Sequence, residues 1–359
     1  MKAVFSAAQL AHAPGRFLSL GNIVDYPESP SRARALLAGA REAGCEIFAA
    51  RREVDTGLLA RVHDADYLSF LKAGFDQWKA LPGAGPEVMP SLRPMKPETV
   101  TNSHVMAQAG RYLMDFSCAL TEATWRSAAA SASTALTAAD FVLRGERVAY
   151  ALCRPPGHHA YGNLASGFCY LNNAALAAEA LRGQHEKVAI LDIDIHHGNG
   201  TQSIFYGRED VLTVSVHADP VSFYPYYWGG AAEAGTGTGE GFNLNLPIPL
   251  RSGDEQWLNA ISRGLERIAA FSPGAVVLAL GLDAHEADPL RGGAVTQAGF
   301  AYAAERIASL GVPTLIVQEG GYLTDHLADN LAMFLSSFDG ALEAVNGAAE
   351  NAAPEVLPG

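Results

Sequence analysis

The sequence lacks the features of a membrane protein and of a nucleic-acid-binding protein. No run of apolar residues is long enough to span a bilayer, and the first residues lack the longer apolar region of a signal peptide. Basic residues are few: 25 Lys and Arg stand against 38 Asp and Glu, which leaves a net charge of −13. An acidic chain disfavours phosphate backbones and anionic membranes, and is compatible with cationic small substrates. We therefore expect no nucleic acid and no membrane among its partners.

Cysteine is also scarce, and its distribution argues against a disulfide framework. The four cysteines, Cys45, Cys118, Cys153 and Cys169, show no paired spacing. Three of them lie in apolar surroundings that are typical of small core residues. We therefore expect a reducing compartment, the cytoplasm.

What the sequence does have is an alternation of short apolar strands and amphipathic helices. The predicted strands are Ala3–Ser6, Val148–Cys153, Val188–Asp194, Val211–His217, Val276–Leu280 and Thr314–Gln318. The predicted helices are Ser31–Glu42, Ala65–Ala80, Thr121–Ala139, Asn172–Leu181, Asp254–Phe271 and Gln297–Leu310. This order predicts an α/β protein of three layers, with a mainly parallel central sheet covered by helices on both faces.

We expect one domain over residues 1–340, because no linker interrupts the alternation. The tail, residues 341–359, has little apolar content and is expected to be disordered. Residues 80–105 are rich in proline and predict a long surface loop. The glycines of residues 235–241 precede a predicted strand, Phe242–Leu246, and no P-loop lysine accompanies them, so they predict a flexible turn rather than a phosphate site.

Acidic residues and histidines follow several predicted strands. After the strand that begins at Val188, strand alternation predicts that Asp192, Asp194 and His196 point the same way, as metal ligands would. Three more polar segments follow other strands: Arg154–Ala160 with the pair His158-His159, Gly281–Asp283, and Glu319–Tyr322. The carboxyl ends of parallel strands meet at one edge of a sheet, so we expect these four segments to form one pocket.

The four motifs, in this order, resemble the histone deacetylase superfamily, the arginase-like deacetylases, over residues 1–338. Within it, the N-terminal part and Val62–Leu68 look most like bacterial acetylpolyamine amidohydrolases and histone deacetylase-like amidohydrolases. The resemblance implies an arginase/deacetylase-like fold and a zinc-dependent amidohydrolase that removes an acetyl or other short acyl group. Its substrate would be an acetylpolyamine, an acetyl-lysine-like amide or another small amide.

The same resemblance assigns roles to residues. One zinc ion per chain would be held by Asp194, His196 and Asp283. Its catalytic residues would be His158 and His159 as general base and acid, their partners Asp192 and Asn199, and Tyr322 as the donor to the oxyanion. His159 should be the less basic histidine when the partners alone are compared. A structural potassium ion would use Asp192, Asp194, Ser215 and the carbonyls of His196 and Val216.

Substrate contacts are expected from Gly167, Phe168 and Tyr224, the last two as aromatic walls of a narrow channel. Acetylpolyamine-selective relatives place acids at the pocket entrance, and the matching places here fall near Phe17 and Met106, neither of which is acidic. Asp25 or Glu28 could replace them. We therefore hypothesise a broad deacylase that also accepts neutral, aromatic or xenobiotic small amides.

Two further functions stay open for this sequence. An arginase-type ureohydrolase shares the fold but needs extra carboxylates that bridge two manganese ions, whereas Asn199 stands at one such place. A non-catalytic zinc-binding scaffold would normally lose a histidine or the tyrosine, and this chain keeps all of them. We also expect a homodimer or homotetramer.

Overall fold

The computed structural model describes residues 1–94 and 102–351, the last six by their backbone alone. Its centre is an eight-stranded sheet in the order β4-β1-β5-β10-β9-β6-β7-β8, and every pairing in it is parallel. The strands are β1 (Lys2–Phe5), β4 (Glu46–Ala49), β5 (Val148–Ala151), β6 (Val188–Asp192), β7 (Val211–Ala218), β8 (Asn243–Ile248), β9 (Ala275–Leu280) and β10 (Thr314–Gln318). The predicted α/β class with a parallel sheet is confirmed.

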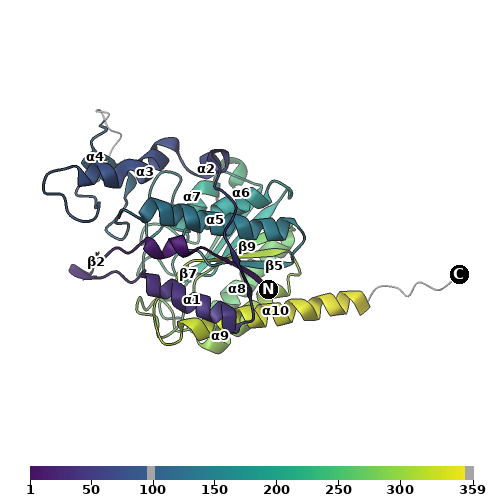
Figure 1. Cartoon of the computed structure of the whole chain (residues 1–359). Helices are drawn as coiled ribbons and strands as arrows, with labels where there is room; N and C mark the ends of the chain where they lie inside the picture. The colour runs from purple at the N-terminus through teal and green to yellow at the C-terminus, as the bar shows by residue number, and fades with distance from the viewer. Residues whose placement is uncertain (95–101, 352–359) are drawn as a thin grey trace.

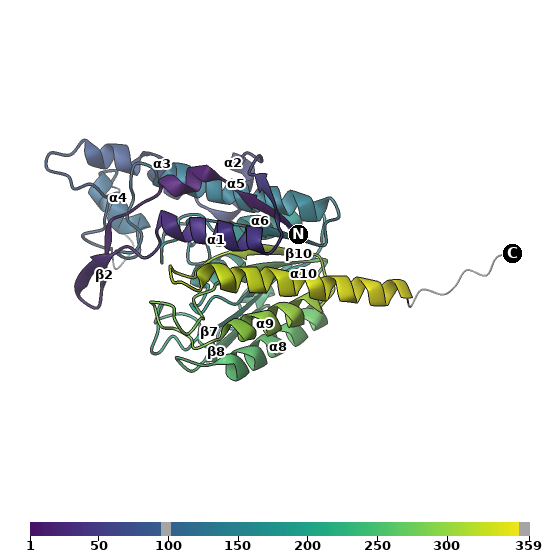
Figure 2. The same ribbon diagram turned by 60° about the horizontal axis from the view of Figure 1, so that its bottom comes forward.

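Helices cover both faces of the sheet, which makes three layers (Figures 1 and 2). One face is covered by α2 (Thr56–Val62), α3 (Ala65–Lys79), α4 (Val105–Tyr112), α5 (Thr124–Leu143), α6 (Asn173–Leu181) and α7 (Asn199–Phe205). The other is covered by α1 (Pro30–Glu42), α8 (Asp254–Phe271), α9 (Gln297–Ala308) and α10 (Leu327–Asn351). Two short 3₁₀ turns, η1 (Ala7–Ala11) and η2 (Gly237–Gly239), complete these elements.

The apolar strand sequences explain why both faces need cover. Along β10, Leu315 and Val317 pack into the core under α5 and α6, whereas Ile316 packs into the core under α8, α9 and α10. Side chains alternate along a strand, so a strand that is apolar at every position must be buried on both faces. The alanines Ala128, Ala132 and Ala135 are fully buried and let α5 lie close to the sheet.

A separate antiparallel hairpin, β2 (Arg16–Ser19) and β3 (Asn22–Asp25), lies away from the central sheet (Figure 2). Its turn consists of Leu20 and Gly21, with φ of 49° and 78°. Positive φ at both central residues is the geometry of a two-residue type I′ turn. The sequence analysis did not predict this hairpin.

The structure differs from the prediction at several boundaries. β6 ends at Asp192, so Asp194 and His196 belong to the irregular segment after the strand, and strand alternation does not orient them. α10 continues to Asn351, so the predicted boundary at residue 340 falls inside a helix. Residues 95–101 of the predicted loop and residues 352–359 of the predicted tail lie outside the described residues. Within the described residues, no helix is both long and apolar enough to cross a membrane.

Candidate active site

The strand order explains how distant motifs meet. Strands β5, β10, β9 and β6 are consecutive neighbours in the sheet, and each is followed by one of the polar segments singled out in the sequence. Their carboxyl ends therefore bring residues 154–160, 319–322, 281–283 and 193–200 to one edge.

Three predicted metal ligands converge at this edge. One ligand atom each from Asp194, His196 and Asp283 lies within 4.8 Å of the other two, and all three residues are buried. Nδ1 of His196 is 3.0 Å from Oδ1 of Asp194 and 3.0 Å from Oδ2 of Asp283. The remaining oxygens are anchored, because the Gly320 N–H donates to Oδ2 of Asp194 at 2.7 Å and the Ile195 N–H to Oδ1 of Asp283 at 3.2 Å.

The surroundings of this cluster fit a divalent cation. A Cβ at Gly320 would lie 2.1 Å from Oδ2 of Asp283 and 2.5 Å from Oδ2 of Asp194, so only glycine leaves room for both carboxylates. Burial opposes ionisation of Asp194, yet His158 and His196 hold the pKa of that carboxyl well below its usual range. Burial and the Asp194 carboxylate raise the pKa of Asp283. A bound metal ion would offset the repulsion between two crowded, buried carboxylates of this kind.

The tandem histidines stand beside the cluster, with ring centroids 4.0 Å apart. Nδ1 of His158 donates to Oδ2 of Asp192 at 2.9 Å, and Nδ1 of His159 donates to Oδ1 of Asn199 at 2.6 Å. On its other side, the Asn199 amide donates from Nδ2 to the Tyr161 hydroxyl at 2.9 Å. With Oδ1 of Asn199 as the acceptor, Nδ1 of His159 carries the proton and Nε2 is left as a proton acceptor.

The two histidines differ in basicity. Burial disfavours the charged form of His158, but Asp192 and Asp194 outweigh it and raise the pKa of His158 to about 10. For His159, burial together with the neighbouring His158 and His196 lowers the pKa well below its usual range. The order of the two pKa values agrees with the one expected from the partners Asp192 and Asn199. Burial and the neighbouring imidazoles nevertheless change the pKa of His159 more than its amide partner does.

Tyr322 follows β10 and is buried at the same site. Its backbone N–H donates to Oδ2 of Asp288 at 2.9 Å, and the Arg32 guanidinium lies 5.5 Å from its ring centre. Burial and the Asp283 carboxylate raise the pKa of the Tyr322 hydroxyl well above its usual value. The hydroxyl is therefore a hydrogen-bond donor at any physiological pH.

A cavity of about 520 Å³ opens onto these groups. His159, His196 and Tyr322 line it, together with four residues predicted to contact substrate, namely Phe17, Gly167, Phe168 and Tyr224. A Cβ at Gly167 would lie 2.3 Å from Cδ2 of His159, so this glycine lets the chain pass directly against the imidazole. Phe168 meets Phe17 and Tyr322 edge to face, at 5.6 and 5.8 Å between centroids.

Other predicted entrance residues do not lie at this cavity. Met106 lies on α4 and lines a separate hollow of about 470 Å³ with Leu92 and Arg111. Asp25 is exposed on β3, and Glu28 is fully buried in ion pairs with Arg32 and Arg154. These positions depend on loop packing, which residue type and spacing do not reveal.

Three acidic residues near the site were given no role by sequence reasoning. Asp115 lines the cavity, and Asp288 accepts a hydrogen bond from the backbone N–H of Tyr322. Oε2 of Glu319 accepts hydrogen bonds from the backbone N–H groups of Gly157 and His158. Burial and the Asp283 carboxylate raise the pKa of Asp288 to about 7. Of the three, only Glu319 could have been found from the sequence, because it directly precedes the Gly320-Gly321-Tyr322 motif.

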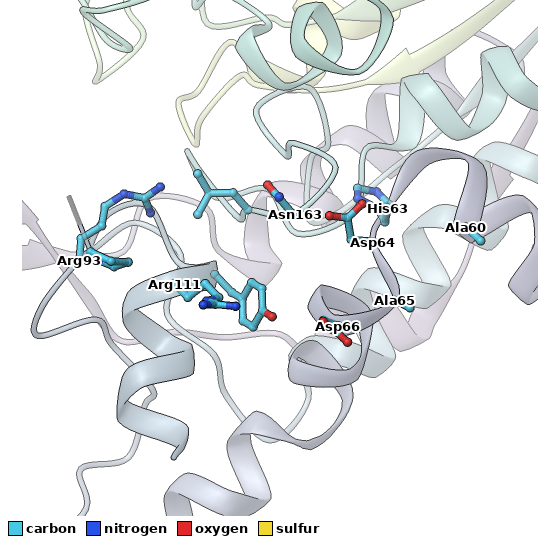
Figure 3. Close-up of a pocket in the computed structure, with 11 residues that line it drawn as sticks. Ala60, His63, Asp64, Ala65, Asp66, Arg93, Arg111 and Asn163 are labelled. Atoms are coloured by element: carbon cyan, nitrogen blue, oxygen red, sulfur yellow. The ribbon is translucent and has the colours of Figure 1, made fainter. Parts of the chain in front are cut away.

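A larger hollow, about 770 Å³, contains none of the predicted site residues. Arg93 and Arg111 lie on one side of it, and His63, Asp64 and Asp66 on the other (Figure 3). Among the described residues, Asp194, His196 and Asp283 form the one group of three potential metal ligands, and its His196 lines the smaller cavity.

The fold and the site together define a parallel α/β protein with a buried group of potential metal ligands at the carboxyl edge of its sheet. The histone deacetylase domain family matches residues 26–338. The chain is 45% identical to an acetylpolyamine amidohydrolase of Burkholderia pseudomallei over 345 residues, 95% of this chain and 99% of that protein. It is 38% identical to an acetylpolyamine amidohydrolase of Mycoplana ramosa over 343 residues, 95% and 100% of the two chains.

Solved structures agree with these sequence matches. The crystal structure of an acetylpolyamine aminohydrolase from Burkholderia pseudomallei superposes with a TM-score of 0.90 at 43% identity, over 96% of this chain and 99% of that one. The chain therefore belongs to the histone deacetylase family, and it is an amide-hydrolysing enzyme. Family membership also implies a catalytic metal.

Proposed function

We propose that the chain is a zinc-dependent amidohydrolase that removes an acetyl or other short acyl group from an amine. The observation that carries the proposal is the convergence of a buried Asp–His–Asp set, a tandem histidine pair and a tyrosine on one aromatic-walled cavity. The relatives named acetylpolyamine amidohydrolases support an acetylated amine as the substrate.

Asp194, His196 and Asp283 would hold one zinc ion per chain. Two carboxylates and one imidazole make a catalytic rather than a closed structural ligand set, because they leave positions for water and for a carbonyl oxygen. A zinc ion bound there would polarise the amide carbonyl and lower the pKa of water. An arginase-type site would need further bridging carboxylates, and the cluster formed by the described residues has two.

We assign the proton transfers to His159. It lines the cavity with Nε2 available, whereas His158 is not among the residues that line it. His159 would accept the proton of the attacking water and return it to the leaving amine. His158, ion-paired with Asp192 at 2.9 Å, would keep positive charge behind it.

Tyr322 would act on the carbonyl oxygen. Its hydroxyl stays protonated and the residue lines the cavity, so the hydroxyl would donate a hydrogen bond to the oxyanion of the tetrahedral intermediate. Asp192 and Asn199 act through the two histidines and do not line the cavity.

A structural potassium ion is the second part of the proposal. Its ligands would be Asp192, Asp194, Ser215 and the carbonyls of His196 and Val216. The support is that Ser215 on β7 stands directly opposite Asp192 on β6, and that both are buried.

We further propose one catalytic domain over residues 1–340 and a cytoplasmic homodimer or homotetramer that acts on a small amide without a nucleic acid or membrane partner. The acidic net charge of −13 and four buried, free cysteines support this setting.

The test is metal analysis combined with turnover. Purified protein should contain one zinc per chain, lose the release of acetate from acetylated amines after chelation, and regain it when zinc is restored. Urea release from guanidino substrates, or full zinc content without hydrolysis of any amide in a broad panel, would contradict the proposal.

A further inference from the structure

The mouth of the cavity is built from apolar side chains, and we define it as Leu18, Leu20, Phe116, Tyr226 and Leu290. Leu20 is 94% exposed, Tyr226 55%, Leu18 44% and Phe116 42%, although all of them line the same cavity as the catalytic groups. Apolar side chains gathered at the rim of an active site mark a surface that contacts ligand.

Asp115 is the one acidic residue among the described residues that line the cavity, and its carboxylate already has partners. It accepts the Ser117 N–H at 2.9 Å, the Ser117 hydroxyl, and the Tyr224 hydroxyl at 2.8 Å. These three donors occupy three of the roughly four acceptor positions of the carboxylate, so a substrate ammonium would gain less from Asp115 than from a free carboxylate.

The conformation of Leu20 supports a contact role. It occupies the first central position of the hairpin turn with φ of 49°, where asparagine, aspartate or glycine is the usual choice. A bulky residue at positive φ is strained, and this one is displayed to solvent. Strain at a position that lines an active site is a reason to look for function there.

We propose that this enzyme prefers amides whose amine portion is uncharged and apolar, aliphatic or aromatic, over acetylated polycations. This proposal rests on the proposed amidohydrolase function and names its substrate class. The acyl group would lie near His159 and Tyr322, and the amine portion would cross the mouth. Each methylene buried there contributes roughly a three- to fourfold gain in kcat/KM.

The experiment compares N-acetylbutylamine with N-acetylputrescine, two substrates that differ only by a terminal ammonium. We expect kcat/KM to favour N-acetylbutylamine by about tenfold or more, because both chains place the same four carbons in the mouth, whereas the ammonium of N-acetylputrescine would lose water against apolar side chains. N-acetylphenethylamine should be hydrolysed at least as well as N-acetylbutylamine. Equal rates for the first pair, or a preference for N-acetylputrescine, would overturn the proposal while leaving the amidohydrolase function intact. Hydrolysis of none of the three would instead contradict the proposed function.

A matched pair of hairpin variants locates the effect. Leu20→Asp places a carboxylate at the mouth and should shift the ratio towards N-acetylputrescine by about fivefold or more. Ile23→Asp is the control, because Ile23 is 69% exposed on the same hairpin but does not line the cavity. An equal shift in both variants, or a Leu20→Asp variant that changes only the oligomeric state in light scattering, would show that the hairpin packs against protein and not substrate.

A second observation, independent of the mouth, concerns Glu319, which follows β10 and is fully buried. Its Oε2 accepts the N–H of Gly157 at 2.6 Å and of His158 at 3.0 Å, and its Oε1 has no partner among the described residues. Its backbone carbonyl accepts a bond from Arg32. One residue thus joins the loop of the tandem histidines to the loop of Tyr322.

We infer that Glu319 is a positioning residue, which holds His159 and Tyr322 at a fixed separation around the reacting carbonyl. Glu319→Gln keeps an oxygen acceptor of the same shape, whereas Glu319→Leu leaves two buried N–H groups unpaired. We expect Glu319→Leu to lower kcat by about a hundredfold with KM changed only a few-fold, because small displacements of reacting groups carry such costs.

Glu319→Gln should recover most of that loss, to within about tenfold of the parent, and both variants should keep the parent's metal content. A Glu319→Leu variant with parental kcat would overturn the inference. So would a Glu319→Gln variant as impaired as Glu319→Leu, since charge and not hydrogen-bond acceptance would then matter.

Discussion

Replacing Asn199 by Asp tests the proposed division of labour between the two histidines. The Nδ1 of His159 lies 2.6 Å from Oδ1 of Asn199, and both residues are buried. The substitution keeps the shape of the side chain and exchanges a carboxamide for a carboxylate. The Tyr161 hydroxyl, which now accepts from the Asn199 amide, can turn and donate to the new carboxylate.

The expected effect is a higher pKa for His159. At about 3 Å and an effective dielectric of 20, two charges attract by roughly 5–6 kcal/mol. Desolvation of the new carboxylate offsets part of this, which leaves a rise of about one to three pKa units. A base with a raised pKa is protonated at higher pH, so the acid limb of the kcat/KM profile should move upward by the same amount.

The assay measures kcat/KM for one acetylated amine from pH 5 to 10, and the metal content of the protein at the lowest and the highest pH. Asn199→Gln, which stays uncharged, is the control and should not move the limb. An acid limb at the same pH in the parent and in Asn199→Asp would refute the assignment of proton transfer to His159.

Three further predictions follow from the same geometry. Tyr322→Phe should bind metal and fold as the parent but lose about 10²–10³ in kcat, and a change of only a few-fold would make Tyr322 structural. His158→Ala and His159→Ala should both lose about 10²–10⁴ in rate, and unequally; near-normal rates across pH in both would remove the pair from the acid–base mechanism. His63 has a pKa lowered to about 4 by burial, so stability should fall as pH drops from 6.5 to 4. In His63→Gln, the slope of the unfolding free energy against pH, measured with urea, should be smaller by about 1.4 kcal/mol per pH unit. Equal slopes in the parent and the variant would contradict this prediction.

The meeting of the proposed metal ligands and proton-transfer residues was predictable because each of these residues follows a strand that its own sequence reveals. Apolar runs such as Val276–Leu280 and Thr314–Gln318 predict buried parallel strands, and polar residues just beyond them must lie at one edge. The prediction of which side chains meet did not require Asp194 and His196 to be on a strand, and they are not.

Loop-borne features were less predictable for a physical reason. Leu20 is displayed by a two-residue turn whose sequence, Leu-Gly, is not a usual type I′ pair. Met106 was expected at the entrance, but the packing of α4 places it at another hollow. The contacts of Asp115 and Asp288 join segments more than thirty residues apart, and residue type alone does not encode such contacts. The helix α10 was not predicted, and its Ala-rich sequence offers little apolar periodicity after residue 340, where a disordered tail was expected.

The central claim is that Asp194, His196 and Asp283 hold the catalytic metal. The most direct measurement is metal content per chain and acetate release in parent and Asp283→Ala protein, both purified with the same zinc supply. The account predicts one zinc per chain and turnover in the parent, and loss of both in a variant that remains folded by circular dichroism. Full zinc occupancy with parental turnover in Asp283→Ala would contradict it.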